Sequence, residues 1–587
     1  MRLVHVTLAL ALVGCGGAVA QRPQVKLPEP PPEDHERLDT DAIVAAVVKV
    51  RGLAPKTPIV FTTVDDEAFA ASFRAEIDRR RRVRGVTAAS VSGAVDPSYY
   101  LAYYDTGKHE VLLRKKTPEW AKLQDGRELV AHEVEHAIQD QHFDLDKLLA
   151  EPEADVERAH LALIEGDAQA VAAGAAAFLD GLPPKRAVVR ATIISEGIGV
   201  DTYVAGGLID PRVANLKPVE REEMIFPYRH GAGFVGALVR AGGFALVDKA
   251  FARPPASSAE IIHPEAYLAG RVRQEVQPIA DPVGWTAVGP KGAVGELALR
   301  NVLTSFGIPP ERVHPIAAGW RGDSFVTFKG PTPRAAYAWT LAMADEPQAS
   351  VLALTLAAHG RAQQRGNIVA YAEGFPDAVA KDVVAALLAA PVKPPPPPVP
   401  PFGAITIPPP PPRIEERLEI RATYAGPLVV NPNLGLRLAL PSGFEGKAID
   451  QKPGLVGLFI TQGGAIALSV DTSRPTPLVV RAMAGGVLSG LKAQGTPSRK
   501  EDVRTHTSLG DVGEMRVGFD ATGARLRFLV LPICKHEASL MVTFFLRGAA
   551  AGVDGEFDRW LQTIDAASID SSPICSEVTA ERTTDLP

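Results

Sequence analysis

One short stretch of the sequence places three side chains where they could bind and use a metal ion. The string HEVEH puts His132 and His136 four residues apart, with Glu133 directly after the first histidine. On an α-helix, residues four apart differ by about 40° in azimuth and lie roughly 6 Å apart along the axis. Both imidazoles can therefore reach one point, with Glu133 beside them. Two histidines and a glutamate in this spacing indicate two zinc ligands and a general base.

The rest of this helix indicates how it is held. Its other face is apolar and consists of Val130, Val134, Ala137 and Ile138. One face can therefore pack into a core while the other carries the chemistry. The alternative is a surface helix with two solvated histidines, and the apolar face argues against it.

A catalytic zinc site needs a third protein ligand and an open position for water. The segment LALIEGDA offers Glu165, 29 residues after His136, which is enough chain for a helix end, a turn and an antiparallel return. Helical spacing is expected over residues 156–178. The neighbouring Gly166 has low helix propensity, and a close approach to the first helix would explain it.

These strings resemble a known family. HEVEHAIQDQHFDL followed by ALIEGDA is similar to the gluzincin metallopeptidases, particularly secreted bacterial members, over about residues 100–270. The resemblance implies one catalytic Zn²⁺ ion held by His132, His136 and Glu165, with Glu133 polarising the water and moving its proton. It also implies a zincin-like fold and a protein or peptide substrate.

Members of this family also hold a ligating histidine in place with a carboxylate. Thermolysin-like members carry an acidic residue four positions after the glutamate ligand, where this chain has Gln169. Asp167 and Asp140 are the two candidates for that carboxylate here.

The oxyanion formed during peptide hydrolysis needs a hydrogen-bond donor besides the metal. Candidates lie in FPYRHG, residues 226–231, which is expected to begin a helix. Tyr228 is the first choice and His230 the second. The alternative for Tyr228 is a half-buried packing role.

Regular elements must position these side chains. The residue pattern predicts a small sheet just before the metal-binding helix, with a hairpin turn at residues 105–108. Either strand of that hairpin, within 101–104 or 110–114, could bind substrate backbone at a sheet edge. The expected strands are 59–64, 99–104 and 110–114, and the expected helices are 41–51, 65–82, 118–149, 156–178 and 232–251.

The N-terminus indicates export. Arg2 precedes an apolar stretch at residues 3–13 that is too short for a stable membrane anchor and is typical of a signal peptide. It ends in LVGC, which resembles the bacterial lipobox, so Cys15 would carry lipid and tether the chain to a membrane. The expected location is the bacterial cell envelope, outside the cytoplasm and on the outer membrane. The alternative is an ordinary signal peptide cleaved near residues 18–20.

Two cysteines remain, Cys534 and Cys575, and in an oxidising compartment they are expected to form one disulfide. Two separate thiols are the alternative. Near the C-terminus, LPSGF at residues 440–444 is expected to enter a sheet and FDRWL at residues 557–561 to open a final helix. With these two strings the C-terminal unit weakly resembles PsbP-like α/β domains, which implies binding of an envelope partner or localisation.

The expected fold class is α+β and multidomain: a mainly helical, zincin-like peptidase domain with a small sheet, and a C-terminal α/β sandwich-type domain. The expected parts are a signal peptide (1–14), a disordered tether (15–40), the peptidase domain (41–275), a mixed extension of it (276–390), a proline-rich linker (391–413), the β-rich C-terminal domain (414–570) and a tail (571–587).

Composition limits the classes of protein to which the chain can belong. With 587 residues, 46% hydrophobic and 22% charged, the chain is globular, and a net charge of −6 gives no reason to expect a nucleic-acid partner. The sequence predicts a lipid-anchored zinc peptidase. Two alternatives stay open: an envelope-binding lipoprotein with a relict metal site, and a zinc hydrolase of a non-peptide amide.

Overall fold

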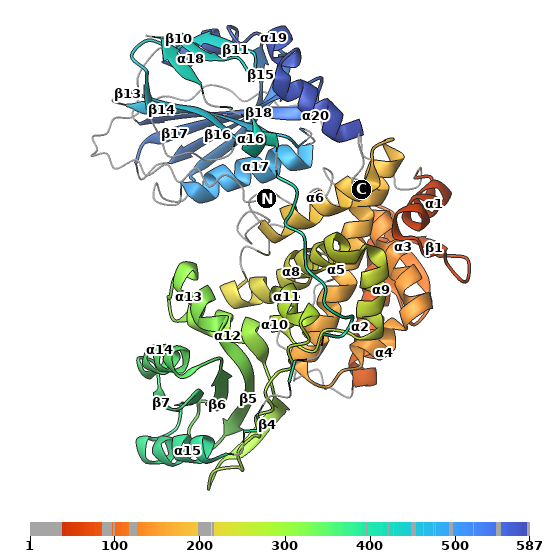
Figure 1. Cartoon of the computed structure of the whole chain (residues 1–587), viewed down its shortest axis with the longest axis vertical. Coiled ribbons are helices and arrows are strands. Elements are labelled where there is room, and N and C mark those ends of the chain that lie inside the picture. Colours follow the sequence, from red (N-terminus) through yellow and green to blue (C-terminus); the bar gives the residue numbers. More distant parts are fainter. Residues whose placement is uncertain are drawn as a thin grey trace.

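The computed structural model describes residues 38–84, 100–116, 126–197 and 216–390, most of 392–583, and the single residues Pro97 and Val213. Within them the protein is mixed helix and sheet, with several units that each have their own sheet (Figure 1). This confirms the coarse fold class. The expected signal peptide, Cys15 and nearly all of the tether lie outside the described residues.

The HEVEH motif lies in a helical unit built around α5 (Ala154–Leu179). By length and composition α5 could span a membrane, but 67% of its most apolar window is buried among other helices, so it is the core helix of this unit. The helices of this unit are α1 (Thr40–Arg51), α3 (Gly126–Phe143), α4 (Leu145–Leu149), α5, α6 (Pro184–Gly197), α8 (Pro218–Gly242), α9 (Phe244–Ala252), α10 (Ser258–Ile262) and α11 (Pro264–Leu268).

Two predicted helices are each divided by one residue. Asp144, with φ of 59°, separates α3 from α4 within the helix predicted over 118–149. Gly243, with φ of 68°, separates α8 from α9 within the helix predicted over 232–251. A positive φ ends the helical hydrogen-bond ladder. At Gly243 this backbone conformation costs little free energy, because glycine has no Cβ.

A three-stranded sheet lies beside the helical unit in the order β1-β3-β2. Its strands are β1 (Val60–Val64), β2 (Ala102–Asp105) and β3 (Glu110–Arg114), and α2 (Asp66–Arg84) covers one face. The other face packs on α3. The predicted hairpin is confirmed, but 110–114 is wrong as a sheet edge: β3 pairs with both neighbours, which leaves β2 at the edge beside α3.

The segment predicted as an extension of the peptidase domain has its own five-stranded antiparallel sheet, in the order β4-β5-β6-β8-β7, with a core on each face. The residues of this sheet unit form β4 (Thr286–Gly292), α12 (Gly295–Ser305), α13 (Pro310–Ala317), β5 (Trp320–Lys329), β6 (Ala336–Met343), α14 (Glu346–Ala357), β7 (Arg361–Arg365), β8 (Ile368–Glu373) and α15 (Asp377–Ala389).

One buried carboxylate organises the centre of this sheet unit. Asp323 accepts hydrogen bonds from the indole nitrogens of Trp320 at 3.1 Å and Trp339 at 2.8 Å. It also accepts from the backbone N–H groups of Val294 at 3.1 Å and Gly295 at 3.2 Å, at the start of α12. Both tryptophans are buried.

The proline-rich segment is not a free spacer. It runs back along the helical unit as an extended strap (Figure 1). Its apolar side chains Phe402, Ile405 and Ile407 pack against the helical core, and Arg240 donates to the carbonyl of Pro408 at 3.2 Å. Apolar residues between the prolines therefore dock the segment.

The C-terminal unit is built on a seven-stranded antiparallel sheet, in the order β12-β13-β14-β18-β17-β16-β15, beside a small sheet of β9–β11. Its helices pack on both faces of the large sheet. The elements are α16 (Ile414–Arg417), β9 (Thr423–Ala425), β10 (Leu428–Asn431), β11 (Leu436–Ala439), β12 (Glu445–Lys447), β13 (Leu455–Thr461), β14 (Gly464–Asp471), α17 (Pro477–Gly490), β15 (Arg499–Thr507), β16 (Gly510–Phe519), β17 (Ala524–Ile533), β18 (Ala538–Arg547), α18 (Val553–Leu561), α19 (Ala566–Asp570) and α20 (Pro573–Thr583).

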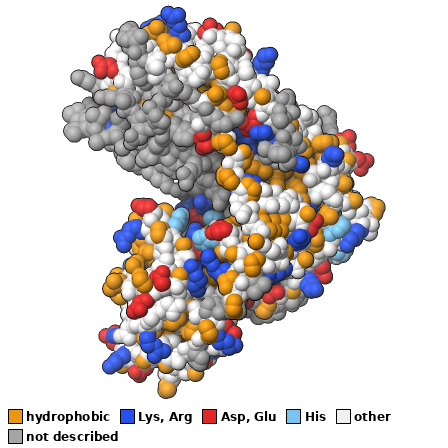
Figure 2. Space-filling view, in the orientation of Figure 1, with side chains coloured by type: hydrophobic (Ala, Val, Ile, Leu, Met, Phe, Trp, Pro, Cys, Tyr) orange, Lys and Arg blue, Asp and Glu red, His pale blue; other side chains and the backbone are white. Residues whose placement is uncertain are grey.

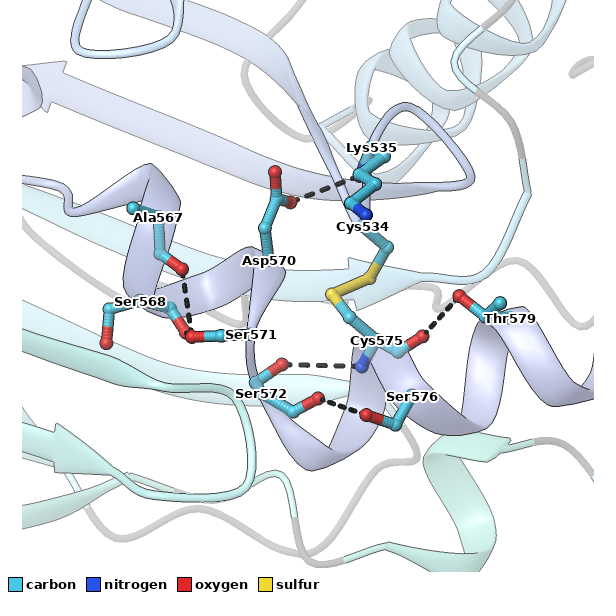
Figure 3. Close-up of a disulfide and its surroundings, with 10 residues drawn as sticks. All are labelled: Cys534, Lys535, Ala567, Ser568, Asp570, Ser571, Ser572, Cys575, Ser576 and Thr579. Atoms are coloured by element: carbon cyan, nitrogen blue, oxygen red, sulfur yellow. Dashed lines mark hydrogen bonds between the residues drawn. A yellow bond between two sulfur atoms is a disulfide. The ribbon is translucent and has the colours of Figure 1, made fainter.

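The predicted tail is wrong for most of its length, because residues 573–583 form α20. A disulfide between Cys534 and Cys575 ties this helix to the turn between β17 and β18 (Figure 3). Ile574 and Val578 of the same helix are buried in the core. The last helix is thus part of the unit.

We expect the stability of the sheet unit to depend on the ionisation of Asp323. Burial raises the pKa of Asp323 from its ordinary 3.8 to about 6, although hydrogen bonds oppose the rise. A raised folded-state pKa means that the carboxyl's contribution to stability is fully present below about pH 4 and is lost as the pH rises through about 6. Asp323→Asn cannot titrate, so its destabilisation should be larger at pH 4 than at pH 7.5, by at most about 3 kcal/mol.

Denaturant unfolding followed by tryptophan fluorescence measures this difference, because two of Asp323's partners are tryptophans. An equal difference between variant and wild type at both pH values would contradict the prediction.

Candidate metal centre

Three predicted ligands from two helices converge at one point. His132 Nε2 lies 3.1 Å from Glu165 Oε2 and 3.0 Å from His136 Nε2, and His136 Nε2 lies 3.5 Å from the same carboxylate oxygen. Their side chains are 14%, 11% and 13% exposed for His132, His136 and Glu165. Within the part of the chain that the structure describes, this is the one group of at least three His, Cys, Asp or Glu residues close enough to hold an ion.

This triangle fits a zinc ion. Tetrahedral ligands about 2.0–2.1 Å from the ion lie about 3.3 Å from one another, and the three separations here run from 3.0 to 3.5 Å. Burial alone would raise the pKa of the Glu165 carboxyl, but His136 and His132 hold it well below its usual range, which suits a cation ligand. Two imidazoles and one carboxylate are a donor set that zinc accepts.

Close packing of α5 against α8 sets the position of Glu165. A Cβ on Gly166 would lie 2.2 Å from the backbone of Gly231, and a Cβ on Gly231 would lie 2.0 Å from the carbonyl oxygen of Ala162. Gly166 does allow a close approach of a second helix, as predicted. That helix is α8, however, and not α3, the helix of His132 and His136. Glycine at both positions lets the two backbones touch.

Glu133 lies beside the ligands and is 6% exposed. Burial raises its pKa, and His132 and His136 oppose the rise. The backbone N–H of Tyr104 hydrogen-bonds the Glu133 carboxylate, and the Tyr104 hydroxyl donates to Asp140 at 2.9 Å. Edge strand β2 is therefore fixed along α3 at two points, one of them the carboxylate expected to act as the base.

Tyr228 joins the centre. Its ring centroid lies 6.3 Å from that of His132. Burial, then the charge of Glu165, raises the pKa of Tyr228 well above its usual value, so the phenol keeps its proton and can donate. Sequence reasoning missed Tyr100, another phenol in the field of these carboxylates, whose pKa burial and Glu165 raise to about 12. No motif marks Tyr100; it lies just before β2.

His230 does not join the centre. Burial holds its pKa well below the usual value, and the charges that lower it further are those of Arg229, Arg300, His314 and His263. Its ring centroid lies 5.2 Å from that of Phe226 on the same helix, and among the described residues no contact of His230 with the three predicted ligands is found. The helix begins at Pro218, not at residue 226 as expected, and residues two apart on a helix point in nearly opposite directions.

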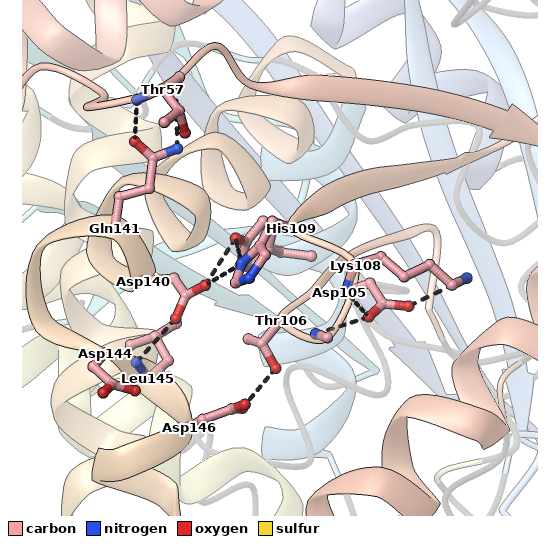
Figure 4. A network of polar contacts seen from close by, with 12 residues as sticks. Thr57, Asp105, Thr106, Lys108, His109, Asp140, Gln141, Asp144, Leu145 and Asp146 are labelled. Carbon is pink, nitrogen blue, oxygen red and sulfur yellow. Dashed lines mark hydrogen bonds and ion pairs between the residues drawn. The ribbon is translucent and has the colours of Figure 1, made fainter.

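Asp140 is wrong as the residue that orients a histidine ligand, because its carboxylate serves the hairpin instead. It accepts from Tyr104, pairs with His109 at 3.0 Å and accepts from the backbone N–H of Leu145 at 3.1 Å (Figure 4). The group that contacts a ligand is Gln139, whose Oε1 lies 2.9 Å from His136 Nδ1. Its position three residues after His136, on the same helical face, is the signal that could have identified it.

Asp167 lies one contact further from the metal ligands. Its Oδ2 accepts from Gln139 Nε2 at 3.1 Å and from Arg51 Nε at 3.1 Å. The other candidate carboxylate therefore acts on His136 through Gln139.

Comparison with known families matches only the sheet unit. A family described as "Domain of unknown function (DUF8575)" matches residues 286–386. No curated protein matches the chain. No solved structure matches it either. The family match does not include the residues of the metal centre, so the centre is interpreted from its geometry.

Adding one methyl group at the contact between α5 and α8 should displace Glu165. We expect Gly166→Ala to lower the unfolding free energy by about 3 kcal/mol or more and to weaken zinc binding, because the new Cβ would meet backbone. Gly555→Ala in α18 is the matched control: the nearest atom there is 3.8 Å away, so its stability should stay within about 1 kcal/mol of wild type.

Thermal unfolding and zinc content after dialysis measure both effects. Wild-type stability and zinc content in Gly166→Ala would show that the contact is looser than described.

Proposed function

We propose that the protein is a zinc-dependent peptidase with one catalytic ion. The observation that supports this most is the triangle of His132, His136 and Glu165 with a buried glutamate, Glu133, beside it. A zinc ion serving structure alone would need four protein ligands and no adjacent base. The centre combines three ligands with a base and a phenol donor, which is the set that hydrolysis of an acyl bond requires.

The protein groups divide the work. Bound zinc would supply Lewis acidity to the water and to the scissile carbonyl. Glu133 accepts the proton of the attacking water and passes it to the leaving amine. The backbone N–H of Tyr104 holds the Glu133 carboxylate in place for this. Burial of Glu133 keeps bulk water from competing for the same proton.

Tyr228 is the proposed donor to the developing oxyanion. Its ring lies beside His132, and the charge of the Glu165 carboxylate acts on its hydroxyl. A phenol held protonated by burial can donate without a change of charge. The position of the ring supports Tyr228 over His230 for this role.

Strand β2 is the proposed site for substrate backbone. Among the described strands it is the edge of the small sheet next to α3, and its Tyr104 N–H faces away from β3 towards Glu133. A peptide added along this edge would bring its backbone to the base. A protein or peptide substrate is therefore the proposed class.

The proposed location is the bacterial cell envelope, outside the cytoplasm, with the chain tethered to the outer membrane through lipid on Cys15. The LVGC string supports this, and a disulfide in the C-terminal unit suits an oxidising compartment. We further propose that the C-terminal unit binds a partner in the envelope.

Replacing Glu133 should abolish cleavage without removing zinc. We expect Glu133→Gln to lower kcat/KM on a peptide library by about 10²–10⁴-fold, because a general base contributes that much. Glu128→Gln, an exposed site on the same helix, is the matched control and should leave the rate unchanged. Cleavage assays with metal analysis measure both.

Stoichiometric zinc together with equal, negligible cleavage by wild type and Glu133→Gln would contradict the peptidase proposal. In that case a relict centre or a non-peptide amide substrate would replace it.

Removing the Tyr228 hydroxyl should slow the chemical step. We expect Tyr228→Phe to lower kcat by about 10²–10³-fold with little change in KM, because an oxyanion donor acts only in the transition state. His230→Ala should leave kcat within about threefold. Steady-state kinetics on folded variants compare the two, and a larger loss of kcat in His230→Ala would reverse the assignment.

A further inference from the structure

Gln139 connects the two helices that carry the metal ligands. Its side chain is fully buried. From α3 its Oε1 lies 2.9 Å from His136 Nδ1. Its Nε2 donates to the carbonyl oxygen of Ile164 at 3.0 Å and to Asp167 Oδ2 at 3.1 Å, both on α5. The amide therefore uses both ends at once.

These contacts determine which way the amide points. A backbone carbonyl only accepts hydrogen bonds, and Asp167 Oδ2 already accepts one from Arg51 Nε at 3.1 Å, so the NH₂ end of Gln139 must face Ile164 and Asp167. Its oxygen then faces His136, and His136 must carry hydrogen on Nδ1. The other ring nitrogen, Nε2, is the one that lies 3.0 Å from His132 Nε2 at the centre. The amide thus selects the tautomer that can bind metal.

The far end of this chain of contacts is anchored by a buried cation. Arg51 of α1 is fully buried in its side chain and pairs with Asp167 at 3.1 Å, Glu135 at 3.3 Å and Asp248 at 2.7 Å. A buried charge is stable only with its partners in place. Arg51 therefore holds Asp167 in place, and Asp167 in turn receives the amide of Gln139.

We propose that Gln139 is a positioning residue of the metal centre, which sets the tautomer of His136 and the distance between His136 and Glu165. Both acceptors on α5 flank Glu165: Ile164 precedes it and Asp167 follows two residues later. One amide therefore acts on two ligands, directly on His136 and through the α5 backbone on Glu165. This inference rests on the proposed metal centre.

The test is the zinc affinity of Gln139→Leu, which keeps the approximate volume but removes the donor and the acceptor. We expect the dissociation constant for Zn²⁺, measured by competition with a chromogenic chelator, to rise about 10–100-fold. Gln141→Leu is the matched control. Gln141 lies on the same helix, and its Oε1 accepts from the backbone N–H groups of Lys56 at 2.6 Å and Thr57 at 3.0 Å. Figure 4 shows the contact with Thr57. The dissociation constant of Gln141→Leu should stay within about twofold of wild type.

A spectroscopic readout separates positioning from general loss of stability. In the zinc-bound wild type, ¹⁵N NMR should show the hydrogen on His136 Nδ1 as hydrogen-bonded and slow to exchange with solvent, because Gln139 Oε1 lies 2.9 Å away, and Gln139→Leu should lose this protection. Gln139→Glu keeps an acceptor for His136 but places a carboxylate against Ile164 and Asp167. It should retain this protection yet still bind zinc more weakly, and it serves if Gln139→Leu does not fold.

Zinc affinities of Gln139→Leu and Gln139→Glu within twofold of Gln141→Leu would overturn the inference. Zinc affinity is measured without any substrate. A wild-type protein whose zinc affinity depends on Gln139 but which cleaves nothing would therefore overturn the proposed activity and leave this inference intact. A wild-type protein that binds no Zn²⁺ would overturn both.

Discussion

The contact between the backbones of α5 and α8 is the constraint on which the rest of the structure depends. At Gly166 and Gly231 a single added Cβ would lie 2.2 or 2.0 Å from the opposite backbone. No other residue permits that separation, and the close-packed interior leaves little room for the helices to move apart. Because α8 lies this near, Tyr228 lies beside His132 and within reach of the charge of Glu165. The positions of Glu165, the proposed metal ligand, and Tyr228, the proposed oxyanion donor, thus depend on the absence of two side chains.

The same core region also holds the neighbouring units. At the start of α5, Asp155 accepts from the backbone N–H of Ser258 at 3.2 Å, and a Cβ on Gly295 would strike its carboxylate. Gly295 begins α12, so the sheet unit meets α5 directly. Next to the other end of α5, Arg190 of α6 donates to Thr472 of the C-terminal unit at 2.8 Å. The unit that matches DUF8575 and the C-terminal unit therefore both touch the helical unit that carries the metal centre.

The sequence alone predicted the features that depend on interactions between residues close together in the chain. Helical periodicity placed His132, Glu133 and His136 on one face, and the hairpin signal placed β2 and β3 correctly, because both depend on the backbone geometry of a few consecutive residues. The proposed third ligand depends on more than local geometry: the sequence favours Glu165 because a carboxylate on a second amphipathic helix can return to the first. The structure brings it within 3.1 Å of His132.

The sequence by itself determined which residues share a helix face, and the tertiary structure alone decided which faces meet. It placed Gln139, not Asp140, against His136, and Tyr228, not His230, beside His132. Periodicity gives the direction of a side chain from its own helix axis, but not the depth, crossing or register at which a second helix packs. Those depend on the shape of both helix surfaces at once. Here they also depend on Gly166 and Gly231, whose role in the close contact can be recognised only once the two helices are packed together.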